Sequence, residues 1–491
     1  MEQNNNSDLR EQTLKEKTAK GVFWGGTSSA LQLLLNLAFG IVLARILDAG
    51  DYGIIGMLAI FSVVAGILQD GGFTAALANK KDVTHEDYNA IFWFGLLSSL
   101  LMYAILFFSA PLISGYFNEP QLLLLSRVLF INIIISGIGV IPIAYLFKHL
   151  MIKQRAISDI ISLLCSGAAG VILALNGFVY WGLAIQTLIY VTVGTCIRWY
   201  FIKWKPTLNI NFSPLKEMFV FSSKIFITSL FYQASANIYS VILGRYYNAT
   251  QVGDYTQGNK WQAMGASLVT SVFTLITQPL FVQAEVKNTD PVKVFRKLVR
   301  LAAFLSFPLL LGLAFIGKEF ITIAIGEKWL PCVPIIQILC LWSAALPIWR
   351  LYNDFLISKG RSDYYMIINI ITGSLQILFA FIMYPYGIIK MLIVFLFINF
   401  GGLLLCHYYT RKIINLRIID VMKDILPYLL ITIGIYIISY FLVYYIENLY
   451  LRFALKLIIP IILYLIIMSV TKSVMFKESV DFLKQQVLKM K

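Results

Sequence analysis

The chain has 491 residues, of which 59% are hydrophobic and 13% are charged, and its formal net charge is +15 at pH 7. A soluble domain has roughly half apolar and a quarter charged residues, so this composition excludes an ordinary soluble protein. The positive charge does not indicate binding to nucleic acid, because the basic residues lie in short segments beside apolar runs, where they report membrane topology.

Apolar runs of about 20 residues, long enough to cross a bilayer, recur along the whole chain. Residues 1–20 are polar and contain no short apolar core with a cleavage site, so we expect no cleaved signal peptide. The five cysteines form no C-x-x-C motif and indicate neither a zinc site nor a disulfide framework. The three histidines, His85, His149 and His407, fall near span ends and are interpreted as interfacial residues.

The apolar runs predict fourteen spans, at 21–45, 53–77, 88–110, 122–147, 156–176, 178–201, 219–245, 255–281, 298–317, 331–352, 363–384, 387–409, 424–446 and 450–471.

Loop charges give the orientation of these spans. Most of the 40 lysines and arginines lie in alternate loops, beginning with the N-terminal segment and ending with the C-terminal tail. By the positive-inside rule, both termini are then cytoplasmic, in agreement with an even number of spans. The opposite loops hold few basic residues: Arg45, Arg245, Lys260, Lys318, Lys328, Lys390 and Arg452.

Two similar passages lie two hundred residues apart and indicate an internal duplication. Leu43-Ala44-Arg45 is followed by Gly50-Asp51-Tyr52, and Leu243-Gly244-Arg245 by Gly253-Asp254-Tyr255, with three extra residues in the second gap. Six spans separate the copies, so both halves enter the membrane in the same orientation. This predicts an all-α membrane protein with two six-helix lobes, related by a parallel repeat about an axis along the membrane normal, and a substrate path between them.

The repeat divides the chain into segments. The last two predicted spans lie outside the duplication and form an appended helix pair. The predicted segments are a cytoplasmic N-terminal segment (1–20), an N-lobe (21–201), a cytoplasmic inter-lobe loop (202–218), a C-lobe (219–409), the helix pair (424–471) and a cytoplasmic tail (472–491).

Few charged residues fall within the predicted spans, and each is a candidate for a site because a charge in the bilayer is costly. Asp70 lies beside Gly71 and Gly72; it either faces a cavity, where it could couple transport to an ion, or caps nearby backbone. Arg127 and Lys224 are candidates for binding an anionic substrate group, although long side chains near an interface also snorkel to it. Snorkelling is likewise the simple interpretation of Arg350 and Lys456, and Asp159 is interpreted as marking the start of its helix.

Arg45 and Arg245 occupy matched outer ends of the two repeats. They form either a basic rim that meets an anionic substrate or ion pairs with Asp51 and Asp254. Two amide pairs also match under the repeat: Gln32 with Asn36, and Gln233 with Asn237. Such amides either join helices or line a wet path, and their shared placement favours the lining role.

Signatures of enzymes are missing from the sequence. It contains no Walker loop, no G-x-S-x-G and no H-E-x-x-H motif. We therefore expect a transporter with no cofactor and no metal site. Its transport would use an ion gradient, H⁺ or Na⁺, or the gradient of its own substrate.

The residues around both copies of the repeat resemble a known family. Ala44-Arg45-Ile46-Leu47 with Gly50-Asp51-Tyr52-Gly53, its echo at 243–255, and Gly326-Glu327-Lys328-Trp329-Leu330-Pro331 are similar to the polysaccharide flippases of the MOP exporter superfamily, nearest the WzxC-like branch. The likeness extends over essentially the whole chain, and the implied fold is MATE-like.

The resemblance implies a function that composition does not show. It implies transfer of an undecaprenyl-pyrophosphate-linked oligosaccharide, a repeat unit of O-antigen, exopolysaccharide or capsule, from the cytoplasmic to the outer leaflet of a bacterial inner membrane by alternating access. The implied partners are this lipid-linked substrate, membrane lipids, and a polymerase and glycosyltransferases of the same pathway, with no nucleic acid. Two alternatives stay open at this point: an ion-coupled drug exporter of the same superfamily, and a membrane polymerase or ligase of the same glycan pathway.

Overall fold

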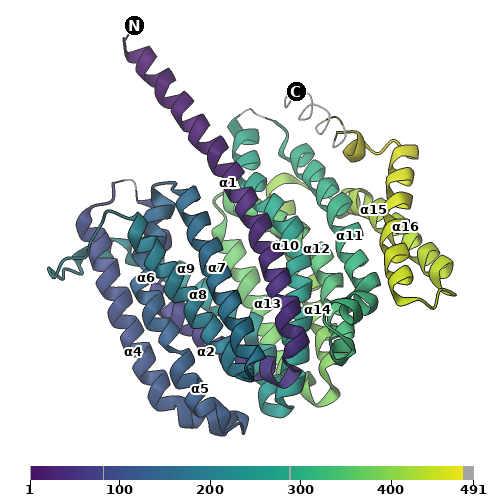
Figure 1. The fold of residues 1–491 in the computed structure, drawn as a ribbon. Coiled ribbons are helices and arrows are strands. Elements are labelled where there is room, and N and C mark those ends of the chain that lie inside the picture. The colour runs from purple at the N-terminus through teal and green to yellow at the C-terminus, as the bar shows by residue number, and fades with distance from the viewer. Residues whose placement is uncertain (1, 81, 287–288, 479–480, 482–491) are drawn as a thin grey trace. The chain divides into compact units, whose positions relative to one another are not determined.

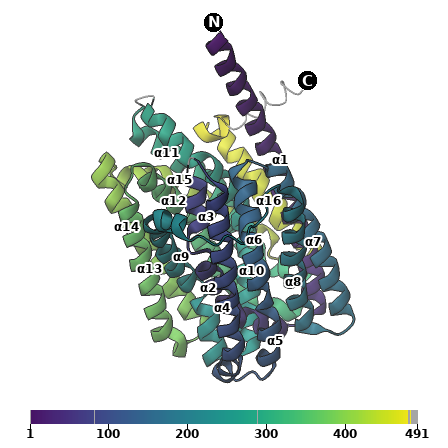
Figure 2. The same cartoon turned by 90° about the vertical axis from the view of Figure 1, so that its left-hand side faces the viewer.

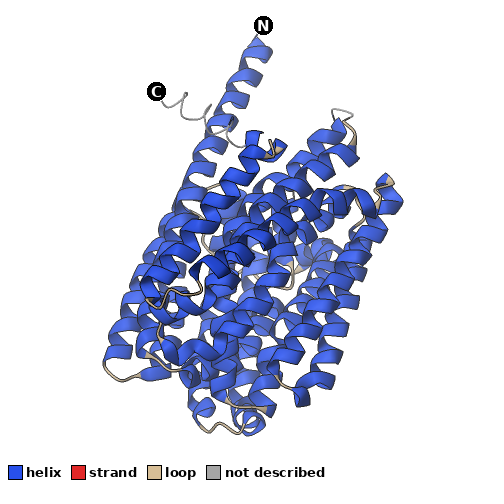
Figure 3. Ribbon diagram, turned by 90° about the vertical axis from the view of Figure 1, so that its right-hand side faces the viewer, coloured by secondary structure: helices blue, strands red, loops and turns tan. Residues whose placement is uncertain are grey.

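The computed structural model describes residues 2–80, 82–286, 289–478 and 481. Within this part of the chain the regular structure is helical throughout and contains no strand (Figure 3). A chain this apolar has to satisfy its backbone N–H and C=O groups inside the membrane, and a helix does so within one segment. The predicted all-α class is confirmed.

The helices form two compact units, Met1–Gly253 and Asp254–Lys491 (Figure 1, purple to teal and teal to yellow). The first unit contains α1 (Glu2–Ile46), α2 (Ala49–Asp70), α3 (Phe73–Asn79), α4 (His85–Phe117), α5 (Gln121–Leu129), α6 (Ile131–Lys148), α7 (Ile152–Leu175), α8 (Val179–Phe201) and α9 (Ser213–Tyr246). The second contains nearly all of α10 (Ala249–Val286), then α11 (Pro291–Ala324), η1 (Glu327–Cys332), α12 (Val333–Ser358), α13 (Ser362–Met383), η2 (Tyr384–Tyr386), α14 (Ile388–Ile414), α15 (Ile418–Val443) and α16 (Leu449–Val470).

Each of the fourteen predicted spans coincides with one helix or with two consecutive helices. Among the described residues, 13 helical segments are long and apolar enough to cross a membrane. The remaining predicted span, 255–281, is helical within α10, but this helix carries Gln257, Asn259, Lys260 and Gln262 in its first half and is less apolar than the others. The protein is a multi-pass membrane protein.

Three predicted spans are not continuous helices. Span 53–77 is interrupted at Gly71 and Gly72, which separate α2 from α3. Span 122–147 is divided into α5 and α6 at Phe130, and span 331–352 begins inside the 3₁₀ turn η1. The two glycines are the strongest of these breaks, because both have left-handed backbone angles, with φ of 57° and 78°.

In the first unit, α2 is the central helix and packs against α4, α6, α8 and α9. The remaining helices form pairs around it, α1 with α7, α7 with α8, and α4 with α6. In the second unit, α11 packs against α12, α15 and α16, while α14 packs against α12 and α13. The main core of the second unit is aromatic, with Phe273, Phe295 and Phe355 fully buried.

The two sequence repeats have the same helix boundaries. Helix α1 ends at Ile46 and α9 at Tyr246, and α2 begins at Ala49 and α10 at Ala249. The linkers are therefore equally long, and the expected three extra residues in the second copy are not in the linker. Instead, Gly253-Asp254-Tyr255 lies about one turn further into its helix than Gly50-Asp51-Tyr52. The two repeats thus match at this helix boundary, and the expected parallel relation between the lobes stays a prediction.

The starts of α2 and α10 cross at reciprocal small residues. A Cβ atom added to Gly53 would overlap the carbonyl group of Ala249, and one added to Gly253 would overlap the carbonyl group of Ala49. Each helix therefore presents an Ala-x-x-x-Gly pair to the backbone of the other, which lets helices approach closely in a membrane. The symmetry of this contact is the structural counterpart of the sequence duplication.

By sequence α9 opens the second repeat, whereas by contact it packs in the first unit, against α2, α3 and α4. The boundaries drawn from the sequence, 21–201 and 219–409, therefore describe repeats and not packed units. They stay a prediction.

The reciprocal crossing predicts opposite effects for two neighbouring glycines. Gly53→Ala should lower the free energy of unfolding by about 2 kcal/mol or more, because the added methyl meets backbone that cannot move aside. Gly50→Ala should leave stability unchanged or raise it, because its Cβ meets nothing within 4 Å and alanine is the better helix former. Thermal unfolding in detergent measures both, and equal stability of the two variants would contradict the tight crossing.

Candidate functional site

Asp70 is the last residue of α2 and also holds the first turn of α3. Its Oδ2 accepts a hydrogen bond from the Gly72 N–H at 3.2 Å, and its Oδ1 accepts one from the Thr74 N–H at 3.4 Å and another from the Thr74 hydroxyl. The Gly71 N–H closes α2 on the Ile67 carbonyl. The capping role predicted as one alternative for Asp70 is therefore present.

The same carboxylate also lines a cavity, so the second alternative is present as well. The cavity, of about 340 Å³, lies between α2 and α9 inside the first unit. It brings together Asp70 and Gln233, two residues predicted from sequence for separate reasons. Its wall is lined by Ser62, Val63, Gly66, Ile67, Asp70 and Gly72 from the α2 side and by Ile225, Phe226, Ser229 and Gln233 from α9.

Ser62 and Ser229 were missed by the sequence analysis. A lone serine in an apolar helix usually bonds its own backbone, so sequence alone gives no signal for a cavity wall. Together the four polar side chains offer a carboxylate, two hydroxyls and an amide, a set of oxygen-rich groups that suits a cation or the hydroxyl groups of a sugar.

The other predicted amides form hydrogen bonds within their own helices. Asn237 donates to the Gln233 carbonyl at 2.9 Å, and Asn36 donates to the Gln32 carbonyl at 2.9 Å. The Gln32 amide donates to the Ser28 hydroxyl at 2.9 Å. None of these three side chains lines the α2–α9 cavity. Of the four amides that the repeat matches, only Gln233 therefore lines the cavity.

The predicted basic candidates lie elsewhere. The Arg127 guanidinium stands over the Phe107 ring at 4.5 Å, and the Arg245 guanidinium stands over the Tyr116 ring at 4.9 Å and donates to the Tyr116 carbonyl. Arg45 is exposed at the end of α1. Lys224 lies in α9, one residue before the cavity-lining Ile225, but its side chain is outside the described residues.

The proposed ion pairs of the rim involve residues with further roles. The Asp51 carboxylate accepts the Asp48 N–H at 3.0 Å and so closes the capping box at the start of α2. Asp254 is buried in the second unit. The rim interpretation of Arg45 and Arg245 stays a prediction.

Three sequence interpretations outside the site are wrong. Asp159 does more than mark a helix start, since it pairs with Arg198 of α8 at 2.6 Å. Lys456 is 13% exposed and bonds the buried Glu319 at 2.7 Å, which fastens α16 to α11. His407 is buried, with its Nδ1 2.9 Å from the Tyr352 hydroxyl. In each case a partner distant in sequence, invisible to local pattern, changed the outcome.

An apolar groove of about 480 Å³ lies in the second unit, between α10, α11, α15 and α16. Its walls are formed by residues such as Leu268, Leu309, Leu313, Ile461 and Leu465, with Lys456 on its lining. A groove of this composition suits a hydrocarbon chain.

Among the described residues no group of three or more His, Cys, Asp or Glu could hold a metal ion.

The fold is similar to transporters of the MOP superfamily. A lipid II flippase MurJ, in an inward closed conformation, matches with a TM-score of 0.72 over 91% of this chain and 98% of that one, at 15% sequence identity. An inward-facing multidrug resistance MATE family transporter matches with a TM-score of 0.62 over 78% of this chain and 94% of that one, at 17% identity. The fold class is therefore that of the MOP transporters.

The sequence places the chain within this class. The model of the polysaccharide biosynthesis protein family matches residues 42–334, a range that contains the whole α2–α9 cavity. The chain belongs to that family, and is a multi-pass membrane transporter of polysaccharide biosynthesis.

Curated relatives span most of the chain. The teichuronic acid biosynthesis protein TuaB of Bacillus subtilis (strain 168) is 25% identical over 72% of this chain and 73% of its own length. The lipopolysaccharide biosynthesis protein WzxC of Escherichia coli (strain K12) is 24% identical over 72% of each. The succinoglycan biosynthesis transport protein ExoT of Rhizobium meliloti (strain 1021) is 20% identical over 71% of each.

The break between α2 and α3 gives a test of the cavity wall. Gly72 combines a φ of 78° with close packing against the Ser222 backbone of α9, so Gly72→Ala should lose about 1 kcal/mol from strain and more from the clash. Gly177 is the matched control, because it has a φ of 82° and nothing within 4 Å of an added Cβ. Thermal unfolding should show a larger loss for Gly72→Ala, and equal losses would mean that α9 does not pack on this turn.

Proposed function

We propose that this protein moves a lipid-linked oligosaccharide, one carried on undecaprenyl pyrophosphate, from the cytoplasmic to the outer leaflet of a bacterial inner membrane. In this proposal both termini are cytoplasmic, and transport proceeds by alternating access. The polymerase and glycosyltransferases of the same pathway are its proposed functional partners.

The observation that carries the proposal is the presence of two unlike binding surfaces in a chain of this family. One unit holds a polar cavity with Asp70, Ser62, Ser229 and Gln233, and the other holds an apolar groove lined by leucine and isoleucine. A hydrophilic solute needs only the first kind of surface. An amphiphile with a sugar head group and a hydrocarbon tail needs both.

The cavity is small for such a head group. Pockets that enclose a drug-sized ligand have volumes of about 300–1,000 Å³, and the α2–α9 cavity, at about 340 Å³, lies at the lower end. An oligosaccharide would enter only after α2 and α9 move apart. The described arrangement of the first unit therefore fits a closed state of this wall, and transport requires a second arrangement.

Asp70 is the proposed coupling residue. A carboxylate inside a membrane segment is costly, and such residues mark ion or proton pathways in transporters. Asp70 combines a cavity-facing position with hydrogen bonds to the first turn of α3, so binding H⁺ or Na⁺ at its carboxylate would change how that turn is held. The ion that couples transport is either of these two.

Replacing Asp70 tests this role. Asp70→Asn keeps an oxygen that can cap α3 but removes the charge, so the protein should fold while transport of a lipid-linked oligosaccharide falls by roughly tenfold or more. The measurement is transport into proteoliposomes, together with restoration of surface polysaccharide in a deletion strain.

Asp290 provides the control for that substitution. Its carboxylate caps α11 by accepting the Val292 N–H at 2.9 Å, but it is exposed and does not line the cavity. Asp290→Asn should leave transport unchanged. Full transport activity of Asp70→Asn would remove the coupling role of Asp70. Export of cationic dyes by the protein, with no glycan defect in a strain from which its gene is deleted, would favour the drug exporter instead.

The remaining alternative is an enzyme of the same glycan pathway. Glycosyl transfer or ligation by the purified protein would establish it and would exclude the transport proposal in this form.

A further inference from the structure

We propose that α3 is a hinged plug that closes the basic end of the α2–α9 cavity, and that Lys80 locks it by clasping α4 and α9. The basic end is the end of the first unit that carries Lys80, Lys148 and the α8–α9 loop, which the positive-inside rule assigns to the cytoplasm. The inference rests on the proposed function only in placing the cavity on the transport path.

The hinge is the pair Gly71 and Gly72, which connects the cavity wall to α3. Both glycines lie in the left-handed region, so α2 and α3 do not form a continuous helix. Gly72 is itself part of the cavity lining, so α3 starts at the cavity. A helix of seven residues joined through two glycines can swing about this joint once the hydrogen bonds from its first turn to Asp70 are released.

The plug is buried in the closed arrangement. Phe73 is 5% exposed and Leu77 is fully buried, and both belong to a core with Tyr88 and Ile91 of α4 and Met218 of α9. Figure 2 shows α3 beside α6 and α9, in agreement with their contacts. The apolar face of α3 thus fills the space between three longer helices at the basic end of the unit.

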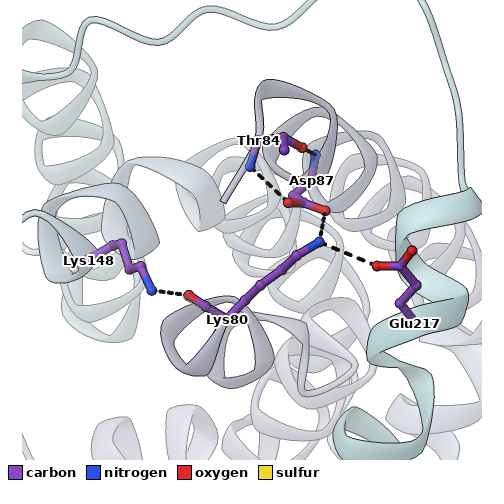
Figure 4. Close-up of polar contacts among 5 residues, drawn as sticks. All are labelled: Lys80, Thr84, Asp87, Lys148 and Glu217. Atoms are coloured by element: carbon purple, nitrogen blue, oxygen red, sulfur yellow. Dashed lines mark hydrogen bonds and ion pairs between the residues drawn. The ribbon is translucent and has the colours of Figure 1, made fainter. Parts of the chain in front are cut away.

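The clasp is formed at the far end of α3 (Figure 4). The Lys80 ammonium lies 2.8 Å from Oδ1 of Asp87 in α4 and 3.5 Å from Oε2 of Glu217 in α9. The Lys148 ammonium, at the end of α6, donates to the Lys80 carbonyl. One residue therefore connects α3 to three other helices, and its hydrogen bond to Asp87 raises the pKa of Lys80, so the ammonium stays charged at physiological pH.

The two ionic contacts of Lys80 differ in strength. Asp87 is buried, and its other oxygen accepts the Thr84 N–H at 2.9 Å, so this half of the clasp is fixed within α4. The Glu217 side chain is 74% exposed, and its contact with Lys80 is long. An exposed pair is worth little and breaks easily, so the Glu217 contact is the releasable half.

The contact between α3 and α9 is also imperfect inside the unit. The Ser222 hydroxyl, in the turn of α9 against Gly72, is buried and has no hydrogen-bond partner among the described residues. An unsatisfied buried hydroxyl favours separation of the two surfaces. Release of Glu217 would therefore let α3 swing away from α9 and open the basic end of the cavity.

A cavity cysteine reports this opening without any substrate. Ser229→Cys would be introduced after the exposed thiols, Cys165 and Cys196, have been changed to serine. A membrane-impermeant maleimide is then applied to the basic end in inside-out vesicles. Glu217→Gln should raise the labelling rate by about two- to fivefold, as expected for loss of one exposed pair, and Lys80→Gln should raise it further.

A second ion pair of the same chemistry serves as the control. Lys297 and Glu478 lie 2.8 Å apart in the second unit, with both side chains about half exposed. Glu478→Gln should leave labelling of Ser229→Cys unchanged. An equal rise in this control, or no rise with Glu217→Gln, would overturn the proposal.

Cross-linking tests the converse. Lys80→Cys with Glu217→Cys, joined by a short bifunctional thiol reagent, should abolish labelling from the basic end, and cleaving the link should restore it. Labelling that persists in the linked protein would also overturn the plug. These measurements need no substrate, so they separate the plug from the proposed function. Labelling that depends on Glu217 and Lys80, in a protein that does not transport a lipid-linked oligosaccharide, would reject the proposed function and leave the plug intact. Transport without such a dependence of the labelling would reject the plug alone.

Discussion

The close crossing of two helix starts is the constraint from which the rest of the first unit follows. Gly53 lies against the Ala249 carbonyl and Gly253 lies against the Ala49 carbonyl, and no larger side chain fits at either glycine. Lipid provides no hydrophobic drive for helices to associate, so such close backbone contact is a main source of packing energy in a membrane. Because α9 leads directly into this crossing, its position beside α2 is set at one end, and the cavity between them is set with it.

Polar groups in both units are held by partners from other helices. Asp159 with Arg198, Glu319 with Lys456, and Asp424 with Arg296 each join two helices across an otherwise apolar contact. Breaking such a pair leaves a charge in a poor solvent, which is why these contacts specify which helices are neighbours. Asp70 differs from these residues: its described partners are the backbone and hydroxyl of the next turn, and its carboxylate also borders open space.

This difference connects structure to transport. A carboxylate that is already paired with a cationic side chain gains little free energy from binding an ion. A carboxylate that accepts hydrogen bonds only from a short hinged helix can exchange those hydrogen bonds for a bound ion. In the proposed function, the apolar groove of the second unit and the polar cavity of the first would receive the two ends of an amphiphile. The family assignment places the chain in polysaccharide biosynthesis, and the cavity, the groove and the joint between α2 and α3 are the elements that the proposed transport cycle would use.

By itself, the sequence determined the helical class, the approximate ends of 13 spans, the repeat and the family, because span length and hydropathy depend on local composition alone. It also selected Asp70 and Gln233, since polar residues are rare in apolar helices. Only the tertiary structure decided that Gln233 lines the same cavity as Asp70 while Asn237, Gln32 and Asn36 bond within their own helices. It also decided that Lys456, Asp159 and His407 have partners. Those outcomes depend on which side chains meet where two helices touch, and in most cases the two residues are more than 30 positions apart in the sequence. Helical periodicity indicates which face of a helix a residue occupies, but it carries no information about the residue that it meets.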